Sequence, residues 1–192
     1  MECHKDFAER ANPHSWLLVA DNLHEQAVRL RRGGPAGYLT LQEPNGRVLA
    51  RWPAENRAVF LLAGFALENA LKAFLVYQNP EWVSNGRLAR RLKTHSLTNL
   101  SMLVVDLPWP KRGPPVLREF ERGLESWARY PCALAAEDSE AEPVLRDALW
   151  RQYLGLMSAY GKALMTLLAR GWSGPHGTGG VWEMEGGYLG AT

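Results

Sequence analysis

The 192-residue sequence predicts an all-α protein, an up-and-down helical bundle with a small β-hairpin inserted at about residues 37–52. Three observations lead to this prediction. Apolar residues make up 46% of the chain, which is enough for one sizeable core at a length typical of a single domain. Most of them recur at steps of three and four residues, the spacing of one helix face. Clusters of Gly and Pro separate these stretches, as turn residues do.

The first long helix is predicted over residues 14–32. Asn12 or Ser15 can cap its N-terminus, Pro13 suits its first turn, and a Gly-Gly-Pro sequence ends it. Its apolar stripe comprises Trp16, Leu17, Ala20, Leu23, Ala27 and Leu30.

The hairpin and the central helix follow in the chain. Pro44-Asn45-Gly46 separates two short runs that can pair as strands. Residues 55–78 are apolar almost all the way round, which is typical of a helix buried on most sides. Asn79-Pro80 ends this helix, because the residue before a proline disfavours the helical region.

Four more helices are predicted from the apolar pattern. Two are short, over residues 87–93 and 95–105, and a third runs over 116–128. The last is long, over residues 143–170, with leucine and tyrosine at helical spacing. Residues 171–192 hold eight glycines and no periodicity, which indicates a flexible tail after one helical domain over residues 1–170.

Charge and cysteine content limit the classes of function. A net charge of +2 gives no global field for nonspecific nucleic-acid binding, so any basic surface is local, and residues 86–95 are its main candidate. The N-terminus has no apolar signal core, and no apolar run reaches the length of a membrane span. Cys3 and Cys132 form neither a metal-binding pair nor a disulfide framework. We therefore expect a cytoplasmic protein that binds no metal and no membrane.

Polar residues interrupt the most apolar helix at Glu68, Asn69 and Lys72, which share one narrow stripe. Glu68 and Lys72 stand in the favourable order for an i to i+4 ion pair. They form either a structural ion pair of the bundle or the polar floor of a functional cleft.

Arg129-Tyr130-Pro131 stands where the 116–128 helix ends. Its guanidinium and phenol groups can turn back over the bundle and meet Glu68. The guanidinium fork suits a structural carboxylate or a bound phosphate, and both interpretations stay open.

The segment GRLARRLKTHSLTNL concentrates basic residues around His95. His95 can move protons near neutral pH, and Arg90, Arg91 and Lys93 can hold a phosphodiester. The alternative is structural: Ser96 or Thr94 caps the next helix, and the basic side chains lie on a solvated face.

Three segments resemble the HEPN superfamily of small helical bundles: FLLAGFALENALKAFLVYQNP, GRLARRLKTHSLTNL and ESWARYP. The likeness covers roughly residues 14–168 in the order of elements. It is closest at the Ala-Leu-Glu-x3-Lys helix, the Lys-x-His-x-Leu segment and the Arg-Tyr-Pro corner. In similar bacterial members an aspartate usually follows the histidine. Ser96 stands there in this chain, so no acidic residue adjoins His95.

Many HEPN proteins are metal-independent ribonucleases of toxin-antitoxin or phage-defence systems, with an Arg-x4-6-His motif that meets its copy across a homodimer. Arg90 and His95 match that spacing, and so do Arg170 and His176. The resemblance thus implies a homodimer without a cofactor, acting on or binding RNA or a nucleotide, with a cognate antitoxin or defence partner. His95 would move protons, and Arg90 or Arg129 would stabilise the transition state.

The same resemblance leaves a second function open. Some members would serve as noncatalytic modules that dimerise or bind a nucleotide or partner protein, with Glu68, Lys72 and Arg129 as structural polar groups.

Overall fold

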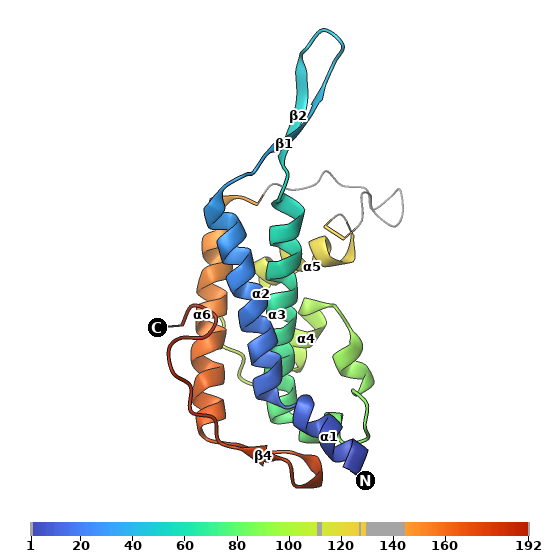
Figure 1. The fold of residues 1–192 in the computed structure, drawn as a ribbon, viewed down its shortest axis with the longest axis vertical. Helices are drawn as coiled ribbons and strands as arrows, with labels where there is room; N and C mark the ends of the chain where they lie inside the picture. The colour runs from blue at the N-terminus through green and yellow to red at the C-terminus, as the bar shows by residue number, and fades with distance from the viewer. Residues whose placement is uncertain (1, 111–112, 127, 130–144, 192) are drawn as a thin grey trace.

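The computed structural model describes residues 2–110, 113–126, 128–129 and 145–191. They form a mostly helical bundle with a two-stranded hairpin, as the sequence predicts (Figure 1). The helices are α1 (Glu2–Arg10), α2 (Pro13–Gly33), α3 (Asn56–Gln78), α4 (Leu97–Leu103), α5 (Gly113–Glu125) and α6 (Asp147–Ala169).

Helix α3 is the centre of the bundle and contacts α2, α4, α5 and α6. Fifteen of its residues are buried, in agreement with its nearly uniform apolar sequence. Contrary to the expectation that no apolar run reaches the length of a membrane span, α3 is long and apolar enough by length and composition, but 78% of the relevant window is buried inside the bundle. It ends at Gln78, where the Asn79-Pro80 sequence was expected to end it.

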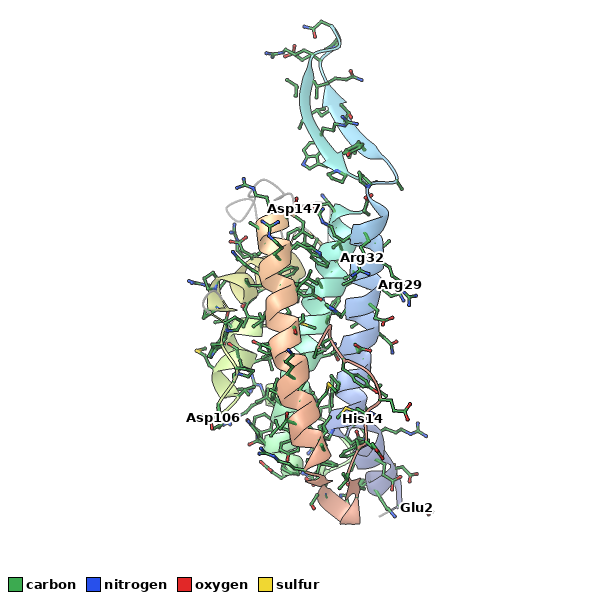
Figure 2. All side chains as sticks on the ribbon, turned by 90° about the vertical axis from the view of Figure 1, so that its left-hand side faces the viewer. Glu2, His14, Arg29, Arg32, Asp106 and Asp147 are labelled. Carbon is green, nitrogen blue, oxygen red and sulfur yellow. The ribbon has the colours of Figure 1, made fainter. Side chains whose placement is uncertain are left out.

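The hairpin pairs β1 (Tyr38–Gln42) with β2 (Val48–Pro53) in antiparallel register. Its turn contains Gly46 at φ +83°, a conformation that glycine adopts without strain. The hairpin stands away from the end of the bundle, between α2 and α3, and Figure 2 shows its side chains projecting clear of the helices. Leu39 is 69% exposed, so the hairpin contributes little to the core.

Several element boundaries differ from those predicted. Helix α1 was not expected, because its nine residues are mostly polar and only Ala8 is buried. The predicted 87–93 helix is a single 3-10 turn, η2 (Arg90–Lys93), and a similar turn, η1 (Pro80–Val83), follows α3. Helix α6 begins at Asp147, later than the predicted residue 143, of which the structure describes nothing.

The glycine-rich tail lies against the bundle. It forms a small hairpin from β3 (Trp172–Ser173) and β4 (Gly179–Gly180), joined by the turn η4 (Pro175–Gly177). The buried indole of Trp172 donates to the carbonyl of Val76, and the amide of buried Leu189 donates to Asp21 on α2. The expected flexibility of the tail stays a prediction, but these contacts make it part of the packed structure.

Candidate functional site

The carboxylate of Glu68 is the centre of the candidate site. It lies on the inward face of α3, 4% exposed, and Lys72 one turn later is 5% exposed. Lys72 Nζ donates to Glu68 Oε1 at 2.6 Å, so the ion pair that the sequence predicts is present and buried. Lys72 Nζ also lies 5.5 Å from the centre of the Trp16 ring on α2, a favourable position for a cation.

The second carboxylate oxygen of Glu68 forms a hydrogen bond with His95. Glu68 Oε2 lies 2.9 Å from His95 Nδ1, although the two residues are 27 positions apart in the chain. A carboxylate oxygen at this distance accepts a hydrogen bond from the Nδ1–H group. In a neutral imidazole with its proton on Nδ1, Nε2 carries no proton and can act as a base. The His95 side chain is 50% exposed, so the imidazole is bonded to a buried acid through Nδ1 and is still accessible to solvent.

The backbone of His95 is held by the start of α4. Ser96 caps this helix by accepting a hydrogen bond from the amide of Asn99, as one of the two sequence interpretations predicts. Its hydroxyl also donates to Glu121 Oε1 of α5 at 2.5 Å. The other oxygen of Glu121 accepts from both the amide and the hydroxyl of Thr98. Glu121 thereby ties α4 to α5 and fixes the residue that precedes the cap.

Arg129 reaches the same surface from the segment after α5. Its guanidinium carbon lies 5.8 Å from the centre of the Phe65 ring, and the His95 ring meets Phe65 edge-on at 6.3 Å. Phe65 on α3 therefore contacts both the basic side chain and the imidazole. Arg129 is exposed and positively charged, and its side chain is flexible. Its guanidinium group could therefore reach a negatively charged group that lies near His95.

Arg90 and Lys93 belong to a neighbouring pocket of about 330 Å³. Trp82 and Arg87 line it as well, whereas His95 does not. Arg91 lies over the Trp82 ring, with its guanidinium carbon 5.6 Å from the ring centre. The sequence match between Arg90 and His95 thus corresponds to two adjacent surfaces.

The structure brings together some of the predicted site residues and separates others. Glu68, Lys72 and His95 form one hydrogen-bonded group. Within the described residues, Arg129 contacts Phe65 and is not a hydrogen-bond partner of Glu68, in contrast to the partner expected from the sequence. Tyr130 lies outside the described residues.

Sequence reasoning missed three residues of this region: Phe65, Glu121 and Trp82. Phe65 was counted as core, although it stands one turn before Glu68 on the same face. Glu121 interrupts the apolar stripe of its helix beside buried Phe120, and such an interruption is a usable signal. Trp82 is the aromatic residue nearest in sequence to the basic segment.

No group of three or more histidine, cysteine, aspartate or glutamate side chains able to hold a metal ion occurs in the part of the chain that the structure describes. The chain matches no protein-family model, no curated protein and no solved structure. Its function must therefore be inferred from the site itself.

Proposed function

We propose that this chain is a HEPN-like helical protein that acts on RNA, as a metal-independent ribonuclease of a toxin-antitoxin or phage-defence system. One observation carries the proposal: His95 is a half-exposed histidine whose Nδ1 is hydrogen-bonded to the buried carboxylate of Glu68, and that bond does not involve Nε2. An acid-oriented imidazole of this kind is a suitable general base. Glu68 would supply the acidic partner that Ser96 does not.

In the proposed reaction, Nε2 of His95 takes the proton of a ribose 2′-hydroxyl. The 2′-oxygen forms a bond to the adjacent phosphorus, and the bond from phosphorus to the 5′-oxygen of the next nucleotide breaks. The products are a 2′,3′-cyclic phosphate and a 5′-hydroxyl, whose proton is returned by the imidazolium or by water. Arg129 would stabilise the charge that develops on the phosphoryl oxygens.

Glu68 would act by positioning His95. Accepting from Nδ1 selects the tautomer with a free Nε2 and stabilises the imidazolium that forms. Lys72 pairs with Glu68 and neutralises part of the negative charge of its carboxylate. Glu68 therefore holds His95 without being an unpaired buried ion.

A second candidate function follows from the same ion pair. The Glu68 and Lys72 side chains are buried and bonded to each other, as expected of a purely structural pair in a noncatalytic dimerisation or nucleotide-binding module. In that case His95 would only close the exposed side of the pair.

The two functions are separated by an RNA cleavage assay in EDTA with purified protein. Wild-type protein should cleave single-stranded RNA, His95→Ala should lower the rate by about 10² to 10⁴-fold, and Arg129→Ala should also lower it. His176→Ala is the matched control, because His176 is the exposed histidine of the other motif match and is hydrogen-bonded to the backbone carbonyl of Ser84, not to Glu68. It should cleave as the wild type does. RNA left intact by wild-type protein across several substrates would refute the ribonuclease and favour the noncatalytic module.

The cellular setting belongs to the same proposal. We propose a cytoplasmic location because of the cysteine content and the apolar pattern of the chain. We propose a homodimer with a cognate antitoxin or defence partner because the resemblance implies both. Light scattering tests the homodimer, and the 21.5 kDa mass of one chain is the value that would contradict it.

A further inference from the structure

The basic pocket beside the candidate site combines positive charge with an aromatic ring. Arg87, Arg90 and Lys93 line it together with Trp82, and Glu81 is its one acidic lining residue. Arg90 and Lys93 are both exposed, so both charged groups are accessible to a ligand from solvent. The volume of about 330 Å³ lies at the small end of the range for ligand pockets.

These residue types suit a nucleotide that is not base-paired. Lysine and arginine side chains neutralise phosphates, and an indole offers a surface on which any base can stack. Arg91 lies over one face of the Trp82 ring and does not line the pocket, so a base in the pocket would stack on the part of the indole that Arg91 does not cover. A base in a duplex is already stacked and paired, so it would have to leave the helix to enter.

The pocket also adjoins the proposed catalytic group along the chain. Lys93 precedes His95 by two residues, and two residues of extended backbone span at most about 7 Å. The backbone between them is extended, with Thr94 at ψ 152°. A phosphate held by Lys93 would therefore lie close to a phosphodiester presented to His95.

We infer that the Trp82 pocket holds an unpaired nucleotide of a single-stranded RNA, next to the bond presented to His95. This inference rests on the proposed function and adds a binding site to it: the pocket accepts one unpaired nucleotide and does not accept a base pair. The base stacks on Trp82, while Arg90 and Lys93 take the flanking phosphates.

Binding is measured in the His95→Ala background, so that no substrate is cleaved. The probe is a fluorescein-labelled single-stranded oligoribonucleotide of mixed sequence, followed by fluorescence anisotropy over a series of salt concentrations. The same strand annealed to its complement is the competing arm. Single-stranded RNA should bind clearly more tightly than the duplex.

The variants separate phosphate contacts from base stacking. Arg90→Ala and Lys93→Ala should each weaken binding and reduce the slope of log affinity against log salt by about 0.7, the value for one phosphate contact on a single strand. Trp82→Leu should weaken binding about tenfold and leave that slope unchanged. Arg151→Ala is the charge control, since Arg151 is an exposed arginine on α6, and it should change neither quantity.

Trp82 packs partly against the core, so each variant is also checked by its melting temperature. If Trp82→Leu unfolds, the exposed Arg90→Ala and Lys93→Ala variants still decide the question. The inference is overturned if these two variants behave as Arg151→Ala does, or if the duplex binds as tightly as the single strand. If the wild type cleaves RNA and the pocket variants bind RNA as the wild type does, the inference about the pocket is refuted and the ribonuclease proposal stands. If the pocket variants weaken RNA binding but the wild type cleaves no RNA, the ribonuclease proposal is refuted and the inference about the pocket stands.

Discussion

Removing the Glu68 carboxylate is expected to be the most destabilising single change in the candidate site. In Glu68→Ala, Lys72 keeps its charge at 5% exposure but loses the oxygen 2.6 Å away, and His95 loses its partner as well. Breaking a buried ion pair by removing one member typically costs about 3 to 5 kcal/mol, because the other charge is left buried and uncompensated. We expect a loss of about 3 kcal/mol, since Lys72 also lies near the Trp16 ring and has a flexible stem.

The neighbouring helix provides a matched control. Glu25 and Arg29 on α2 form an ion pair with the same i to i+4 spacing, at 2.9 Å, but their side chains are 54% and 69% exposed. Glu25→Ala should therefore change the free energy of unfolding by no more than about 0.5 kcal/mol. The two pairs differ in burial and in the additional bond of Glu68 to His95, so the comparison measures the cost of an unpaired buried charge together with the loss of that bond.

The assay is chemical denaturation at neutral pH, with melting temperature as the second readout. For a chain of this size a loss of about 3 kcal/mol lowers the melting temperature by roughly 6 to 12 °C. Replacing both members by apolar residues, Glu68→Leu with Lys72→Met, should cost less than Glu68→Ala alone, because no charge is then stranded. A Glu68→Ala variant no less stable than Glu25→Ala would refute this reasoning.

Two further predictions concern the face of α2 and α6 that the tail covers. A Cβ at Gly161 would overlap the backbone oxygen of Tyr188, so Gly161→Ala should displace the tail and speed its cleavage by a glutamate-specific protease at Glu183, which is already exposed. Gly155→Ala on the same helix meets nothing within 4 Å and should instead stabilise the protein by about 0.5 to 1 kcal/mol; equal digestion of the two variants would count against tail docking. Burial beside Tyr153 lowers the pKa of His24 to about 4, below the ordinary value of about 6.5, so the unfolded chain binds the proton more readily. Stability from neutral His24 should be complete above about pH 6.5 and fall by up to about 3 kcal/mol toward pH 4, whereas His24→Asn should show a flatter profile; parallel profiles would exclude this role.

Much of the fold could be predicted from the sequence because its signals are local. The apolar residues of α3 lie on all sides of the helix, which requires a central position wherever the other helices pack. Asn12 caps α2 and Ser96 caps α4 through bonds to residues only three positions away, so the residue type is sufficient. The turn of the hairpin was likewise readable from Pro44-Asn45-Gly46.

The candidate site was predicted only in part. The Glu68 and Lys72 pair lies within one helix and follows from its period. The bond from His95 to Glu68 joins two elements, and the sequence pointed to Arg129 as the partner of Glu68. In the structure the Arg129 guanidinium lies over the Phe65 ring instead. The two residues belong to different elements, so no spacing of residues in the sequence predicts this contact.

The sequence by itself determined the long helices α2, α3, α5 and α6 and which of their faces are buried, because these depend on periodicity and on bonds to near neighbours. It did not indicate α1, and it predicted a helix over residues 87–93 where the structure has a 3-10 turn. Only the tertiary structure decided which side chains meet across those faces. Helix crossing angles and side-chain rotamers place Glu68 against His95 and Glu121 against Ser96, and they are set by packing of the whole core. The tail shows the same division, since its glycines carry no period, while Gly161 provides the close approach that only the folded bundle makes apparent.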